Sequence, residues 1–248
     1  MRRDELSWFS GQLPVIGPVR QAALLASQAA VIGLGRIGTS AALALHAAGV
    51  GKLVLIDPQR LEDEQIGPMW FLRRDQIGTP KVRAVADLLR DRPYGRVEPV
   101  LSTAEAPETA DIIRRSGIVL SCANTISARL KTERNAIAHG VPVVQAAAFD
   151  GRERLGGIVT VRLPETPDRA CFGCLAADSG AIQRGEGLLT TVTSLLGVLA
   201  AHLATLIISS PHGGIPDRSI FVLNGSTGTV EALTVRRRPD CPICGAPA

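Results

Sequence analysis

Residues 29–57 read AAVIGLGRIGTSAALALHAAGVGKLVLID, and this stretch decides the fold. A short β-type run precedes the glycine turn of residues 33–38, and the Ala- and Leu-rich stretch 39–48 follows without proline or glycine. A second strand-like run then begins at Lys52 and ends in the acid Asp57. The order strand, Gly-x-Gly-x-x-Gly turn, helix, strand and acid predicts a nucleotide-binding β-α-β unit.

Each glycine of this turn has its own expected role. Gly33 allows the tight turn, Gly35 lets the backbone approach a phosphate, and Gly38 lets the helix pack close to its strand. The helix, expected to begin near Ile37, directs its first N–H groups and its positive dipole end at an anion. Asp57 follows Gly33 by 24 residues and can bind both hydroxyls of a ribose. The motif does not separate NAD from ATP, and a glycine-rich helix start without a ligand is the alternative.

Beyond this unit the pattern continues as α/β and then changes to alternating β. Residues 58–80 are irregular and polar, whereas a strand-rich region begins at Gly156. We therefore expect a Rossmann-like three-layer α/β sandwich with a mostly parallel sheet and a β-rich C-terminal extension. The expected helices are 39–48, 81–91, 108–115, 127–139 and 188–208, and the expected strands are 29–32, 52–57, 97–101, 118–122, 141–148, 158–163 and two runs within 219–235.

The composition excludes long disorder and leaves one membrane question. The 248 residues are 46% hydrophobic and 20% charged, which suffices for a sizeable core. The apolar run 188–208 is long enough for a membrane span. It contains four threonines, Ser194 and His202, and it has no flanking charge pattern, so we expect a buried helix and no membrane.

The charge balance first suggests nucleic acid. The net charge is +4 and the pI is about 9.0, and of 27 basic residues only Lys52, Lys81 and Lys131 are lysines. Against that, the arginines are scattered, aromatic residues make up only 3%, and the densest basic run is 236–238. We therefore expect no nucleic-acid partner, and phosphate-bearing small molecules fit the charge equally well.

Four of the five cysteines form two Cys-x-x-Cys pairs, Cys171/Cys174 and Cys241/Cys244, and Cys122 stands alone. The first residues lead into no apolar segment typical of a secretory signal, so we expect a reducing, cytoplasmic setting. Four thiolates can complete a closed tetrahedral site, which predicts structural zinc. Redox or unliganded pairs are the alternative, but a redox pair usually begins a helix after a strand, and we expect neither pair to do so. Cys122 is expected to be a packed thiol.

Together these segments resemble the ThiF/MoeB/HesA family, the ubiquitin-activating-enzyme-like adenylyltransferases. The resemblance runs from about Leu13 to Gly245 and rests on the glycine turn, on AAGVGKLVLID at 47–57, on IGTPK at 77–81 and on the cysteine pairs, all in the family's order. It implies that Mg-ATP is used to adenylate the C-terminal carboxylate of a small carrier protein or peptide, or a small acid. A sulfur or nitrogen nucleophile would then take the acyl group.

The resemblance also implies an assembly and roles for individual residues. It implies a structural Cys₄ zinc site and a homodimer, or a heterodimer with a related chain. We expect a single unit over 1–248, with 13–150 binding the nucleotide and 151–248 bearing zinc, facing the substrate and forming the dimer. The implied nucleotide-binding residues are Gly33, Gly35, Arg36, Gly38, Asp57, Gln65 and Lys81, and the implied catalytic residues are Arg73, Arg74, Lys81 and Asn124.

Several positions depart from the family pattern. Where the family has Asn-x-x-Arg-Gln between the acid and the lysine, this chain has Gln65, Pro68 and Met69. Asn124 replaces an aspartate that binds magnesium, and Phe9 lies in a stretch where the family has an arginine that reaches the partner's ATP. The residues that could replace the arginine lost at position 68 are Arg36, Arg73 and Arg74.

Three functions are therefore consistent with the sequence. The first is an adenylating enzyme with a rebuilt phosphate site. The second is a non-catalytic member that serves as one half of a heterodimer or as a binding scaffold. The third is an NAD-dependent oxidoreductase, which is disfavoured because Tyr94 is the only tyrosine and no lysine lies near it in sequence.

Overall fold

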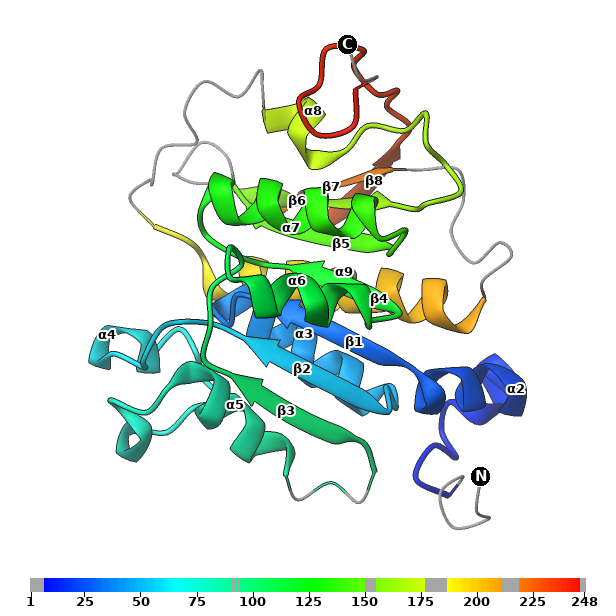
Figure 1. Ribbon diagram of the computed structural model, residues 1–248. Helices are drawn as coiled ribbons and strands as arrows, with labels where there is room; N and C mark the ends of the chain where they lie inside the picture. The colour runs from blue at the N-terminus through cyan, green and yellow to red at the C-terminus, as the bar shows by residue number, and fades with distance from the viewer. Residues whose placement is uncertain are drawn as a thin grey trace.

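The computed structural model describes residues 7–90, 92, 94–149, 155–176, 187–210 and 219–245. Their strands form one eight-stranded sheet (Figure 1). The strand order is β3-β2-β1-β4-β5-β6-β7-β8. The first five strands in this order are parallel, and β6, β7 and β8 each run antiparallel to the strand before them. The strands are β1 (Gln28–Ile32), β2 (Lys52–Ile56), β3 (Arg96–Val100), β4 (Ile118–Ser121), β5 (Val143–Ala148), β6 (Gly156–Arg162), β7 (Ile220–Asn224) and β8 (Thr229–Leu233).

Helices cover both faces of this sheet and produce three layers (Figure 1). On one face α3, α5 and α9 pack through residues such as Ala41, Val85 and Leu196. On the other face α6 and α7 pack through Ile113 and Ala128. The helices are α2 (Leu13–Ala26), α3 (Arg36–Ala47), α4 (Asp63–Ile66), α5 (Lys81–Leu89), α6 (Pro107–Arg114), α7 (Ile126–Ala138), α8 (Phe172–Ala176) and α9 (Thr190–Ser209), with a 3₁₀ turn η1 (Arg74–Gln76).

The expected three-layer fold with its mostly parallel sheet and β-rich C-terminal extension is confirmed. Each expected helix and strand is present within three residues of its expected start. Three α-helices, α2, α4 and α8, and the 3₁₀ turn η1 were not expected; α4 and η1 lie in the stretch 58–80 that we expected to be irregular. In α2, Gly17 has a φ of +78° and Pro18 follows it, so the helix is kinked and its sequence pattern is broken. The helix α8 has five residues, too few to show a helical period.

One side of the long apolar helix α9 packs against the rest of the molecule, so the helix expected to be buried is buried on that side only. It lies against α3 so closely that a Cβ at Gly197 would come 2.4 Å from the carbonyl oxygen of Ile37. Its length and hydropathy would also suit a membrane span, with 44% of the apolar window buried. The outer side of α9 remains apolar, since Leu195 is 52% and Val198 is 50% exposed.

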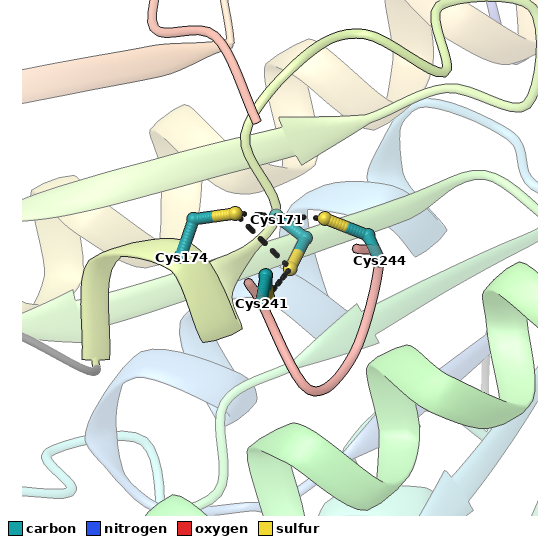
Figure 2. Close-up of side chains that lie close together, drawn as sticks. All are labelled: Cys171, Cys174, Cys241 and Cys244. Carbon is teal, nitrogen blue, oxygen red and sulfur yellow. Dashed lines mark hydrogen bonds between the residues drawn. The ribbon is translucent and has the colours of Figure 1, made fainter. Parts of the chain in front are cut away.

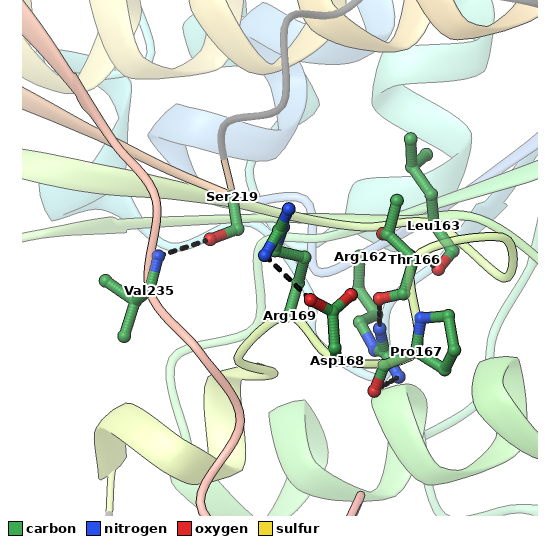
Figure 3. A network of polar contacts seen from close by, with 8 residues as sticks. All are labelled: Arg162, Leu163, Thr166, Pro167, Asp168, Arg169, Ser219 and Val235. Atoms are coloured by element: carbon green, nitrogen blue, oxygen red, sulfur yellow. Dashed lines mark hydrogen bonds and ion pairs between the residues drawn. The ribbon is translucent and has the colours of Figure 1, made fainter.

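A polar network fixes the loop between β6 and the first cysteine pair (Figure 3). Arg162, the last residue of β6, donates to the carbonyl oxygens of Thr166 and Pro167. Farther along the loop, the N–H of Ala170 donates to the carbonyl oxygen of Val235 in the C-terminal tail at 2.8 Å. The tail therefore runs beside this loop, which brings the second cysteine pair to the first.

Candidate functional site

The candidate nucleotide site lies where the strand order reverses. From β1 the chain adds β2 and β3 on one side, and it then returns to place β4 and β5 on the other side of β1. In open α/β sheets, ligands bind in the crevice outside the carboxyl ends of the two strands at such a switch point. Here those ends are Ile32 and Ser121, which the glycine turn and the Asn124 segment follow directly.

The three glycines of the turn differ in their surroundings. Gly33 has a φ of +88°, and a Cβ there would lie 2.7 Å from the backbone nitrogen of Ala123. A Cβ at Gly38 would lie 1.8 Å from the carbonyl oxygen of Gly33. In contrast, a Cβ at Gly35 would meet no atom within 4 Å, and Gly35 immediately precedes the twelve-residue helix α3. Open space at a helix N-terminus suits an anion.

Asp57 is buried, and backbone groups hold its carboxylate. Its Oδ2 accepts the N–H of Leu34 at 2.6 Å, and its Oδ1 accepts the N–H of Gln59 at 2.7 Å. The acid thereby joins the end of β2 to the glycine turn. Each carboxylate oxygen keeps a further lone pair, so the group can also accept from the hydroxyls of a ligand.

Lys81 is buried at the start of α5, with 3% of its surface exposed. Its Nζ donates to Oε1 of Gln59 at 2.8 Å. Burial lowers the pKa of Lys81, and the charges of Asp57 and Glu62 oppose that shift. Lys81 is therefore not an ordinary surface lysine at a helix start, and it lies within the electrostatic reach of the ribose-binding candidate Asp57.

Asn124 is exposed in the bend between β4 and α7, and a neighbouring arginine supports this bend. Arg129 of α7 is buried, and it donates to the carbonyl oxygens of Ala146 at 2.8 Å and Ser121 at 3.5 Å. Burial lowers the pKa of Arg129 to about 10. Sequence reasoning missed this residue; the only local signal is its place on the first turn of the helix that follows Asn124.

Two of the three arginines considered as replacements have other partners, and the third is exposed. Arg73 is exposed and pairs with Asp75 at 3.0 Å, a hydrogen bond that raises the pKa of Arg73. Arg74 is exposed in η1, and Nη1 of Arg36 donates to the carbonyl oxygen of Leu188 at 2.7 Å. Within the described residues, no hydrogen bond joins these arginines to the buried acid or lysine of the site.

The positions that depart from the family pattern also have structural roles. The amide of Gln65 completes a capping box with Glu62 at the start of α4. Met69 is buried in the core on the α3 face of the sheet. Phe9 is buried as well, and the centroids of its ring and of the Tyr94 ring lie 4.7 Å apart. Sequence reasoning identified these departures but could not show that two of them fill the core.

The four cysteines of the two pairs converge at one buried point (Figure 2). Their Sγ atoms all lie within 4.8 Å of one another, with Cys171–Cys241 at 3.6 Å and Cys174–Cys244 at 3.5 Å. A tetrahedral zinc ion with Zn–S bonds of about 2.3 Å requires sulfur–sulfur distances of about 3.8 Å. The cluster could therefore hold a zinc ion.

The first cysteine pair begins a helix, and our expectation on this point was wrong. Cys171 directly precedes α8, and the N–H groups of Phe172 and Gly173 donate to the carboxylate of Glu133 at 3.0 and 3.2 Å. Glu133 lies on α7, so the groups that start this helix are satisfied from a distant part of the chain. A redox pair needs only two cysteines, whereas four converge here.

Cys122 is a packed thiol beneath the glycine turn. A Cβ at Gly38 would lie 3.2 Å from the Cβ of Cys122. Burial raises the pKa of Cys122 to about 12, so the thiol stays protonated at neutral pH. This placement gives no support for a nucleophilic role.

Comparison with known proteins identifies the family. A family model described as "ThiF family" matches residues 9–243, which includes the glycine turn and Lys81 and ends within the second cysteine pair. The chain belongs to the ThiF family. This agrees with the resemblance that the sequence motifs indicate.

Two curated relatives of this ThiF-family chain are of similar length. The SAMP-activating enzyme E1 of Haloferax volcanii is 27% identical over 236 residues, which cover 93% of this chain and 84% of the relative. The sulfur carrier protein ThiS adenylyltransferase of Escherichia coli is 28% identical over 229 residues, which cover 91% of this chain and 88% of the relative.

Solved structures support the fold. A crystal structure of E. coli MccB with selenomethionine-labelled MccA superposes with a TM-score of 0.79 at 14% identity, covering 96% of this chain and 74% of that one. At this identity the likeness shows the ThiF-type fold alone.

Proposed function

We propose that this chain uses Mg-ATP to adenylate the C-terminal carboxylate of a small carrier protein or peptide, or the carboxylate of a small acid. The observation that carries the proposal is the meeting of three features at one switch point: the open helix start at Gly35, the buried acid Asp57 and the buried cation Lys81. The relatives reported above are named as activating or adenylyltransferase enzymes, and one name specifies a sulfur carrier protein.

Adenylation is a transfer that depends on positioning and on stabilisation of phosphate charge. A carboxylate oxygen of the substrate attacks the α-phosphorus of ATP, the bond to the bridging oxygen breaks, and pyrophosphate leaves. In our proposal the N–H groups at the start of α3 bind phosphate oxygens, and Lys81 neutralises polyphosphate charge. Asp57 accepts hydrogen bonds from the ribose. A sulfur or nitrogen nucleophile then takes the acyl group and releases AMP.

Magnesium and zinc have separate proposed sites. The exposed amide oxygen of Asn124, at the switch point, is the candidate magnesium ligand, and it is a weaker ligand than a carboxylate. The four cysteine sulfurs leave a zinc ion no open position, so we propose a structural role that joins the C-terminal tail to the loop after β6.

We further propose a dimer, either of this chain or with a related chain. An apolar groove between α9 and the β7–β8 hairpin suits a partner surface, and its lining residues are Leu195, Val198, Leu199, His202, Leu223, Gly228 and Val230. We treat 1–248 as one unit, with 13–150 binding the nucleotide and 151–248 contributing zinc and the dimer surface. Reduced thiolates suit a cytoplasmic location.

The alternatives have weaker support. The burial of Met69 and Phe9 is compatible with a non-catalytic half of a heterodimer, because core residues contribute nothing to an ATP site. The names of the relatives, however, favour catalysis of adenylyl transfer over both this role and an NAD-dependent oxidoreductase. Co-purification of an intact related chain would support the heterodimer.

The test is exchange of labelled pyrophosphate into ATP. We expect exchange that requires magnesium and a small carrier protein with a free C-terminal carboxylate, and we expect none with the same protein when its C-terminus is amidated. ATP binding is measured in parallel by calorimetry, with NAD as the comparison nucleotide. Tight NAD binding together with no ATP binding and no exchange would refute the proposal.

A further inference from the structure

Gln59 holds the buried lysine of the candidate site. Its side-chain Oε1 accepts a hydrogen bond from Nζ of Lys81 at 2.8 Å, and its carbonyl oxygen accepts from the N–H of Lys81 at 2.9 Å. An isolated antiparallel bridge between Arg60 and Pro80 lies beside these contacts. The segments that contain Gln59 and Lys81 are thus held together, and both the backbone N–H and the side-chain Nζ of Lys81 donate to Gln59.

The group of Gln59 that accepts from Lys81 is a neutral amide, so it leaves the positive charge of Lys81 available to a ligand. The carboxylates that influence Lys81 are Asp57 and Glu62. Asp57 is bound to two backbone N–H groups, and Glu62 belongs to the capping box of α4. The direct acceptor is an amide, which orients the ammonium group without cancelling its charge.

Other cations of the candidate site are less suited to this task. Arg73 is exposed and paired with Asp75, and Arg36 donates to a backbone carbonyl. Position 68, where the family has an arginine, is Pro68. The charge of Lys81 consequently matters more here, and a carboxylate at position 59 would compete directly with phosphate for the ammonium group.

We infer that Gln59 is a positioning residue whose neutral amide orients the Lys81 ammonium group toward the polyphosphate of the nucleotide without placing a further negative charge beside it. The inference rests on the proposed function, since it requires that ATP binds at this switch point. It predicts that Gln59 makes the site bind nucleotides with more phosphate charge in preference to those with less.

The decisive variant is Gln59→Glu, which keeps size and acceptor geometry and adds one negative charge. We expect magnesium-ATP to bind about tenfold more weakly or worse, and AMP to bind with nearly unchanged affinity, both measured by calorimetry. Gln59→Met removes the acceptor without adding charge, and we expect a loss of ATP affinity of about threefold. Gln28→Glu adds the same charge at the opposite end of β1 and should leave both affinities unchanged.

A double-mutant cycle separates positioning from general damage. In a Lys81→Met background, Gln59→Glu should cost no further ATP affinity, because the group on which it acts is gone. Equal losses for ATP and AMP, an undiminished loss in the Lys81→Met background, or unchanged ATP affinity would each overturn the inference. Failure of the unaltered protein to bind ATP would instead refute the proposed function.

Discussion

Gly35 and Gly38 lie three residues apart and are glycines for different reasons. A side chain at Gly38 meets backbone 1.8 Å away, whereas a side chain at Gly35 meets open space. We expect Gly38→Ala to cost about 2 kcal/mol or more of folding free energy, because neither backbone segment can yield easily. We expect Gly35→Ala to unfold at nearly the same temperature as the unaltered protein but to bind ATP at least about tenfold more weakly.

Thermal unfolding and calorimetry of these two variants check both statements. The pair serves as its own control, since each substitution adds one methyl group to the same turn. If Gly35→Ala binds ATP normally, the space beside the start of α3 is not the phosphate site.

His46 gives a pH dependence to the end of the sheet opposite the candidate site. It is buried in the last turn of α3, and its ring stacks on the ring of Tyr94 with the two centroids 5.2 Å apart. Its Nε2 has no hydrogen-bond partner among the described residues. Burial lowers the pKa of His46, and the charge of Arg92 lowers it further. The folded state therefore favours the neutral ring, and the unfolded state binds the proton more readily.

Stability from this group is present above the ordinary histidine pKa of about 6.5 and is lost as the pH falls below it. We expect the melting temperature to drop between pH 7.5 and pH 5, and His46→Gln to reduce that drop. The comparison removes the contribution of carboxylates, which both proteins share. An identical drop in both would show that His46 is not the group responsible.

Among the elements, α7 connects the candidate site with the cysteine cluster. Its first turn carries the buried arginine that supports the Asn124 bend, and one turn later Glu133 binds two N–H groups of α8. Removing Glu133 leaves those N–H groups unpaired inside the protein. We expect Glu133→Ala to lose about 2–4 kcal/mol of stability and to release zinc to a chelator sooner.

Glu133→Gln retains one acceptor oxygen and should show a smaller effect on both measurements. Lys131→Ala, on the exposed side of the same helix, is the matched control and should change neither. If zinc retention is the same in Glu133→Ala and the control, α7 does not support the first cysteine pair.

Most elements could be predicted from the sequence because their signals are local. The glycine turn, the alternation of apolar runs and the two cysteine pairs each lie within a few residues. What could not be predicted depends on distant partners. The start of α8 is satisfied by Glu133, 39 residues earlier, and Lys81 is held by Gln59, 22 residues earlier. The hydrophobic periodicity of the sequence does not reveal such contacts, so the burial of Lys81 became evident only in the structure.

At the scale of the whole molecule, the apolar groove between α9 and the β7–β8 hairpin sets the proposed assembly. Leu195 and Val198 are half exposed on α9, and Val230 adds to the groove from β8. We expect Leu195→Glu to convert a dimer to monomers, measured by light scattering after size exclusion, because a buried charge opposes association. Val19→Glu, at an 82% exposed position on α2, should leave the assembly intact.

A monomer in the unaltered protein would refute the proposed dimer, and a dimer that tolerates Leu195→Glu would place the interface elsewhere. Either outcome leaves adenylation itself untouched, since the switch-point residues belong to one chain.

The cysteine cluster also sets an order of events during synthesis. Its two halves are 70 residues apart, and the second pair is at the very end of the described chain. At ribosomal speeds of about 5–20 residues per second, the first pair waits about 4–14 seconds for its partners. The parallel strands are complete before then. A zinc ion held by all four cysteines would therefore bind last, after the parallel strands have had time to form.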